Sequence, residues 1–243
     1  MTISRVTLTV SGTLTALLLA GCSATPMGVD PPGSATAPRG PSAPKSSGSV
    51  RYLALGDSVT SGEGVSTEQT YPSRLAALWR EKGCDVELSN VAVTGYKSAD
   101  VIGEELPAAA TFKPTLVTLM VGGNDVANGV GVEEYRGNVR TILRELTDAG
   151  TTVVTISQQF WDRTPVGEGY GSREELTAKR IEFDAALIEE GRAVGATHVD
   201  LKRIFEEQAD KQMWLEDELH PTAAAYDEWA AALAKAVADP CET

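Results

Sequence analysis

From residue 50 onward, short runs of β-branched and other apolar residues alternate with longer segments that have the periodicity of amphipathic helices. The apolar runs predict strands at residues 50–56, 86–91, 115–121, 151–157 and 196–201. The periodic segments predict helices at residues 71–82, 132–149, 173–194 and 222–238. Continuous apolar runs are typical of parallel strands that are buried on both faces. The alternation therefore predicts an α/β layered domain built on a parallel sheet.

Polar motifs stand directly after the first three predicted strands. Gly56-Asp57-Ser58 follows the first strand, Gly95 ends the loop after the second, and Asn124 lies in a Gly-Gly-Asn-Asp turn after the third. Each motif by itself also fits an ordinary turn or helix cap. In open α/β sheets, however, ligands collect beyond the carboxyl ends of the strands. The coincidence of three such motifs indicates a functional site at that edge.

The chain has two histidines, and their surroundings differ. His198 lies inside the last predicted strand, where a side chain packs between layers, and we interpret it as structural. His220 lies in a loop three residues after Asp217 and just before the last predicted helix. A turn between them sets the carboxylate against the histidine Nδ1–H and leaves Nε2 for Ser58, the arrangement needed for acyl transfer. Asp200 is the alternative acid.

These motifs, in this order, resemble the SGNH (GDSL-type) hydrolase family of serine esterases and lipases. The resemblance implies that Ser58 is the nucleophile, that His220 is the general base and that Asp217 orients it. It also implies an oxyanion hole formed by the backbone N–H groups of Ser58 and Gly95 and the side-chain amide of Asn124.

The same resemblance implies a three-layer α/β/α sandwich of the flavodoxin type, whose five-stranded parallel sheet has the strand order 2-1-3-4-5. It covers about residues 50–238, with valine at position 59 where the family pattern has leucine. The chain lacks a Gly-x-Ser-x-Gly elbow because residue 60 is threonine, which argues against the α/β-hydrolase fold. We expect no metal and no organic cofactor.

The expected function is a serine esterase that hydrolyses carboxylic esters through an acyl-enzyme on Ser58. Short acyl chains are favoured because no long apolar lid segment is evident. Residues 160–171 are expected to rim the pocket and residues 61–64 to shape its acyl side. The substrate is a small-molecule, lipid or glycan ester. The alternatives are an O-acyltransferase for envelope glycans or lipids, and a surface binding lipoprotein without turnover.

The first 49 residues lack the patterning of a fold. Arg5 precedes a short apolar run, and Leu19-Ala20-Gly21-Cys22 resembles a bacterial lipobox. We therefore predict a lipoprotein signal peptide at residues 1–21, with lipidation of Cys22 and attachment to the outer face of the cell membrane. The alternative is an ordinary secretory signal. Residues 22–49 are rich in Pro, Ser, Ala and Gly and predict a disordered tether before a hydrolase domain at 50–243.

Charge and cysteine content set further limits. The formal net charge is −13, which disfavours nucleic-acid binding. No Cys-x-x-Cys spacing supports a metal site. In the implied strand order, Cys84 and Cys241 follow two helices that end at the same edge of one face, so we predict a disulfide that pins the carboxyl terminus. We expect a monomer.

Overall fold

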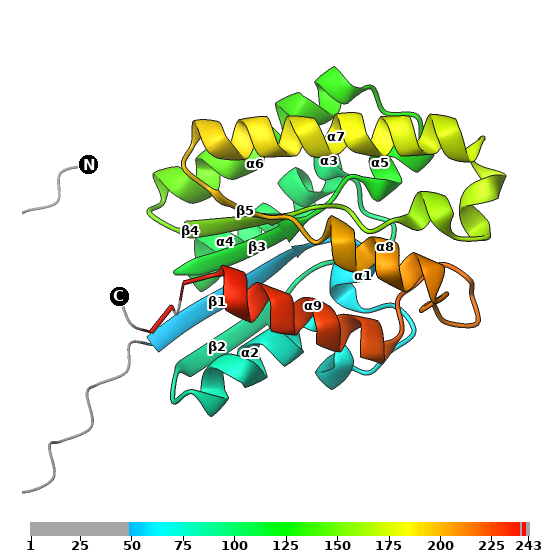
Figure 1. The fold of residues 1–243 in the computed structure, drawn as a ribbon. Coiled ribbons are helices and arrows are strands. Elements are labelled where there is room, and N and C mark those ends of the chain that lie inside the picture. Colours follow the sequence, from blue (N-terminus) through cyan, green and yellow to red (C-terminus); the bar gives the residue numbers. More distant parts are fainter. Residues whose placement is uncertain (1–48, 239, 242–243) are drawn as a thin grey trace, which may run out of the picture. The chain divides into compact units, whose positions relative to one another are not determined.

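The sheet of the computed structural model has the predicted topology. The structure describes residues 49–238 and 240–241, so the predicted signal peptide, Cys22 and all but the last residue of the predicted tether lie outside the described residues. The strands are β1 (Ser49–Gly56), β2 (Asp85–Asn90), β3 (Leu116–Met120), β4 (Thr152–Ile156) and β5 (Thr197–Val199). They pair in parallel in the order β2-β1-β3-β4-β5, which confirms the predicted flavodoxin-like arrangement (Figure 1).

The four predicted helices are present, and their ends agree with the prediction to within two residues. They are α2 (Tyr71–Glu81), α6 (Val132–Asp148), α7 (Arg173–Ala193) and α9 (Ala223–Ala236). Side-chain caps explain where two of them begin. The Thr70 hydroxyl accepts the N–H of Ser73 ahead of α2, and Thr222 caps α9 in the same way through Ala225.

Several helices were not predicted, and most of them are short. They are α1 (Ser58–Ser61), η1 (Thr67–Gln69), α3 (Ser98–Asp100), the π-helical turn η2 (Val101–Glu105), α4 (Leu106–Phe112), α5 (Gly123–Ala127), η3 (Trp161–Arg163), η4 (Val166–Gly169) and α8 (Lys202–Asp210). One or two turns are too short to show a helical period. The longer helix α8 was not predicted either, because only Phe205, Gln208 and Ala209 form its buried face.

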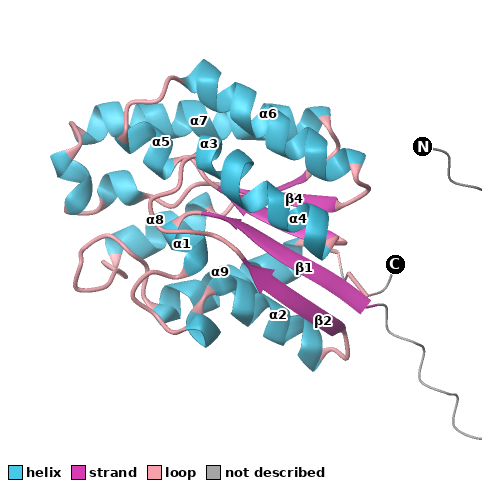
Figure 2. Ribbon diagram, turned by 180° about the vertical axis from the view of Figure 1, so that it is seen from behind, coloured by secondary structure: helices cyan, strands magenta, loops and turns pink. Residues whose placement is uncertain are grey.

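Two hydrophobic cores lie on opposite faces of the sheet, and β1 contributes to both. Tyr52 and Ala54 pack toward α2 and α9, whereas Leu53 and Leu55 pack toward α6 and α7. Figures 1 and 2 show these helix pairs covering the two faces. This alternation explains why the strand sequence is apolar at nearly every position. No helix among the described residues is long and apolar enough to cross a membrane.

A disulfide joins Cys84 to Cys241, with a Cα–Cα distance of 5.7 Å. Cys84 directly precedes β2, at the edge of the sheet where the parallel strands begin. Figure 1 shows the end of the described chain close to the start of β1. The carboxyl terminus is therefore fastened at the edge opposite the carboxyl ends of the strands.

Candidate active site

Ser58 lies in the sharp turn that follows β1. The Asp57 carboxylate accepts the N–H of Val59 at 3.0 Å and so caps α1, in which Ser58 is the first residue. Gly56, with φ +152°, leaves no room for a side chain, because a Cβ there would collide with the carbonyl oxygen of Met120. The turn therefore places the serine at the carboxyl edge of the sheet.

Asp217 and His220 form a hydrogen-bonded pair within a tight turn. His220 Nδ1 lies 2.6 Å from Asp217 Oδ2, and the backbone N–H groups of His220 and Leu219 each donate to Asp217 Oδ1 at 3.0 Å. Partial burial works to raise the pKa of Asp217, but these hydrogen bonds outweigh it and hold the pKa below its usual value. Asp217 is thus a carboxylate that orients the imidazole ring.

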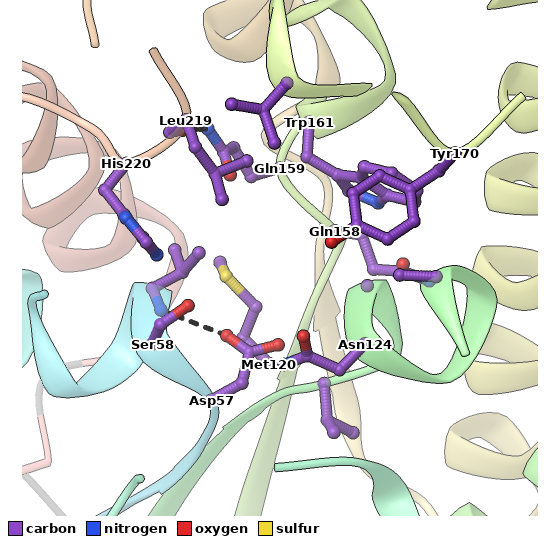
Figure 3. A pocket seen from close by; sticks show the side chains of 15 residues that line it. Asp57, Ser58, Met120, Asn124, Gln158, Gln159, Trp161, Tyr170, Leu219 and His220 are labelled. Carbon is purple, nitrogen blue, oxygen red and sulfur yellow. Dashed lines mark hydrogen bonds between the residues drawn. The ribbon is translucent and has the colours of Figure 1, made fainter. Parts of the chain in front are cut away.

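The loop that carries this pair is fixed at its base. The His220 carbonyl accepts the N–H of Leu215 at 2.8 Å, and the Met213 carbonyl accepts that of Thr222 at 3.1 Å. Gln159 donates its side-chain amide to the Leu219 carbonyl at 3.1 Å, which joins this loop to the segment after β4. Figure 3 shows the His220 ring directed toward Ser58. The loop therefore holds the histidine over the start of α1.

A cavity of about 80 Å³ opens beside Ser58 and His220. Its walls are Asp57, Ser58, Val59, Met120, Val121, Gly123, Asn124, Ala127, Gln158, Gln159, Trp161, Val166, Tyr170, Leu219 and His220 (Figure 3). Most of these side chains are apolar or aromatic. Trp161 and Tyr170 meet edge to face, with ring centroids 5.9 Å apart. Residues 160–171 therefore form one wall of the cavity, as predicted, whereas residues 61–64 do not line it.

Buried charges hold this wall to α7. Arg180 donates to Asp162 at 2.8 Å, and its guanidinium lies 3.7 Å from the centre of the Phe160 ring. Asp184 accepts the backbone N–H of Gln158 at 3.0 Å. Arg180, Asp162 and Asp184 are all at least 96% buried. Because these contacts are made inside the protein, the cavity wall is pre-organised.

The two remaining predicted oxyanion donors are placed differently. Asn124 lies in α5 and lines the cavity, and its side-chain amide donates to the Tyr96 carbonyl at 3.0 Å. Gly95 has a left-handed backbone, with φ +85°, and is exposed; it is not among the cavity residues. The structure thus brings Ser58, Asn124 and His220 to one cavity, while Gly95 lies in the neighbouring loop, next to the residue that Asn124 contacts.

His198 and Asp200 lie away from the cavity. His198 Nδ1 is 3.0 Å from the Thr155 hydroxyl on the adjacent strand, and burial lowers the pKa of His198. Asp200 accepts the backbone N–H of Lys202 at 2.8 Å, at the start of α8. These contacts agree with a structural His198, and Asp200 has no contact with His220.

The buried roles of two motif aspartates, and the presence of two glutamines in this region, were not anticipated from the sequence. Burial, helped by the nearby charge of Asp125, raises the pKa of Asp57 to about 6. Asp125 is fully buried and accepts hydrogen bonds from the backbone and hydroxyl of Ser98. Gln158 and Gln159 follow the end of β4 after a single residue, so extending the strand-end argument to the fourth strand would have found them.

The match to a family model decides the classification. The model of the GDSL-like lipase/acylhydrolase family matches residues 54–228. The chain belongs to this family. The matched range includes all five residues predicted to carry the chemistry. Among the described residues, no group of three or more His, Cys, Asp or Glu side chains is placed to hold a metal ion.

Curated relatives with this kind of sequence are esterases. The chain is 26% identical to "Esterase TesA" of Pseudomonas aeruginosa over 108 residues, which cover 44% of this chain and 54% of that protein. It is 24% identical to "Thioesterase 1/protease 1/lysophospholipase L1" of Escherichia coli K12 over 174 residues, covering 70% and 74%. With the first of these relatives, the similarity spans about half of the relative's length.

Solved structures share the fold over most of their length. A crystal structure of TesA superposes with a TM-score of 0.61 at 20% identity, covering 75% of this chain and 95% of that one. The acetylxylan esterase Axe2 of Geobacillus stearothermophilus gives a TM-score of 0.65 at 16% identity, covering 77% and 94%. At these identities the likeness establishes the three-layer fold with its five-stranded parallel sheet.

Proposed function

We propose that this protein is a serine esterase that cleaves carboxylic esters through an acyl-enzyme on Ser58. The observation that carries the proposal is the Asp217–His220 pair, whose ring is directed toward Ser58 at the mouth of the cavity. Membership of the GDSL-like lipase/acylhydrolase family supports the same chemistry.

The reaction follows from this geometry. The Ser58 hydroxyl attacks the ester carbonyl carbon while its proton passes to His220 Nε2, and the Asp217 carboxylate stabilises the imidazolium that forms. The tetrahedral intermediate collapses, His220 gives the proton to the departing alkoxide, and an alcohol leaves. Water then attacks the acyl-enzyme, with His220 again taking a proton, and the carboxylic acid and free Ser58 are released.

The oxyanion of the intermediate needs hydrogen-bond donors. The Asn124 amide nitrogen carries two hydrogens, and the bond to the Tyr96 carbonyl uses one of them. The second is available to the substrate oxygen, together with the backbone N–H groups of Ser58 and Gly95. A pre-organised donor of this kind contributes about 3–4 kcal/mol to transition-state stabilisation. Tyr96 thus holds the Asn124 amide in place.

Labelling with a fluorophosphonate probe tests the proposed function. The wild-type protein should form a covalent adduct on Ser58, and Ser58→Ala should form none. Ser61→Ala is the matched control, because Ser61 is in the same short helix but does not line the cavity; it should label like the wild type. If correctly folded wild type is not labelled, a binding protein without turnover replaces the esterase.

We also propose that the esterase prefers short acyl chains. The cavity is small, and the Trp161 and Tyr170 rings form its wall. Nitrophenyl acetate and butyrate should be turned over faster than the octanoate, and Trp161→Ala should raise the octanoate-to-butyrate ratio of kcat/KM by about tenfold because it enlarges the cavity. Phe112→Ala removes an aromatic ring outside the cavity and should leave the ratio unchanged. A wild type that prefers the octanoate contradicts this proposal.

Export and lipidation at Cys22 complete the proposal. The Leu19-Ala20-Gly21-Cys22 motif after an apolar run supports a lipid anchor and a position outside the cytoplasm. The Cys84–Cys241 disulfide supports an oxidising compartment independently of that motif. The enzyme would then act on its ester substrates at the outer face of the cell membrane.

A further inference from the structure

We propose that Glu105 is a positioning residue of this esterase: its buried carboxyl group holds the end of β1, and through it the nucleophile turn of Ser58. The inference rests on the function proposed above. Glu105 does not line the cavity, so it acts through the backbone and touches no substrate.

The end of β1 extends beyond the end of its neighbour β2. The pairing of β1 with β2 ends at Ala54 and Asn90, and the last bond along this edge runs from the N–H of Val91 to the Ala54 carbonyl. Two residues further along, the N–H of Gly56 points to the same edge, where the neighbouring strand has ended. Glu105 Oε2 accepts this N–H at 2.9 Å. The carboxyl group thus replaces a strand partner two residues before Ser58.

Glu105 reaches this position from the π-helical turn η2. It is the last residue of the π-helical turn η2 and is only 1% exposed. Its flanks are apolar and buried, with Val101 on one side and Leu106 on the other. Single π turns recur at functional sites because the extra residue redirects a side chain. Burying a carboxyl group is costly unless it is hydrogen-bonded, and here Oε2 accepts the Gly56 N–H at the edge of β1.

The Glu105 carboxyl group lies near two segments of the proposed oxyanion hole. The backbone N–H of Val93 faces the same carboxyl group and lowers its pKa, although it does not complete a hydrogen bond. Val93 lies two residues before Gly95, and Gly56 lies two residues before Ser58. One carboxyl group therefore lies between the two segments that carry the proposed backbone donors.

The charge state of Glu105 matters because acids surround it. Burial, together with the nearby carboxylates of Asp57 in the β1–α1 turn and Asp100 in α3, raises the pKa of Glu105 to about 8, although the hydrogen bond from Gly56 works to lower it. The carboxyl group is therefore neutral at pH 7. Above pH 8 it adds a negative charge behind the turn in which the oxyanion must form, so turnover should fall there.

Three variants separate positioning from simple stability. Glu105→Gln keeps an acceptor for the Gly56 N–H and cannot ionise, whereas Glu105→Leu removes the acceptor. Glu190→Leu is the matched control, since Glu190 of α7 is also buried but pairs with Arg140 of α6 and does not line the cavity. For each variant we would measure the fluorophosphonate labelling rate, kcat and KM on nitrophenyl acetate from pH 6 to 10, and hydrogen exchange of the Gly56 amide.

The expected results differ between the variants. Glu105→Leu should lose protection of the Gly56 amide and lower both kcat and the labelling rate by roughly tenfold to a hundredfold, with KM nearly unchanged. Glu105→Gln should keep kcat at pH 7 and lose the wild-type decline above pH 8. Glu190→Leu should alter neither kcat nor the pH profile.

Other results overturn the inference. If the wild type is labelled and Glu105→Leu is labelled at the same rate, Glu105 does not position Ser58, and the proposed function stands. If the wild type is not labelled, the proposed function fails and the positioning role fails with it. Should Glu105→Leu not fold, Glu105→Gln decides: an alkaline decline identical to that of the wild type contradicts the inference, and a flattened one supports it.

Discussion

Replacing His220 by alanine should lower kcat for a nitrophenyl ester by about 10⁴-fold or more, while KM changes little. The reason is that His220 is the base directed toward Ser58 and is held there by Asp217. Without it the serine hydroxyl keeps its proton, and the acyl-enzyme loses the base that activates water. Steady-state kinetics at pH 7, with circular dichroism to show that the variant is folded, measure the effect.

The second histidine provides the matched control for this prediction. His198 lies on β5 against Thr155 and does not line the cavity, so His198→Ala should retain kcat within a few-fold. Asp217→Asn should be slow as well, because the asparagine cannot stabilise the imidazolium. Equal losses of kcat in His198→Ala and His220→Ala would show that neither histidine acts as the base.

Removal of the Cys84–Cys241 disulfide should produce the largest change in stability. The bond links residues 157 positions apart, and the chain-entropy model gives a loop of this length about 5 kcal/mol of the free energy of unfolding. The double substitution Cys84→Ser/Cys241→Ser should therefore unfold at much lower urea concentration. Its kcat should stay near that of the wild type, because the bond lies at the opposite edge of the sheet from Ser58.

Urea unfolding followed by circular dichroism checks this value. The experiment is best made with Cys22→Ser in every sample, so that no third thiol exchanges with the pair. Wild type in reductant should behave like the double variant, which separates loss of the cross-link from the effect of the serines. A difference below 1 kcal/mol between oxidised and reduced protein would contradict the prediction.

Prediction from the sequence succeeded for features that depend on residues close together in the chain. Apolar runs mark strands buried on both faces, so the ends of all five strands were predicted to within two residues, although β5 is three residues shorter in total than expected. The Asp217–His220 pair was also predictable, because a four-residue turn brings its two ends together.

Other features depend on contacts between distant parts of the chain. Glu105 is one position in a short segment, and only the end of β2 at Asn90 leaves the Gly56 N–H for it to bind. The anchoring of the cavity wall by Arg180 and Asp162 likewise joins a loop to the interior of α7. No local sequence pattern predicts which of two distant residues will form such a contact. The exposed position of Gly95 also depends on the path of its loop, which the sequence does not specify.

The two ends of the described chain lie at one edge of the sheet, and the cavity lies at the other. Residue 49 begins β1, and Cys241 is bonded beside the start of β2. A fusion partner or a solid support joined directly at residue 49 or beside Cys241 is therefore attached at the edge opposite the mouth of the cavity. Immobilised enzyme should accept substrate from the bulk phase as readily as free enzyme does, because attachment covers the edge that takes no part in turnover.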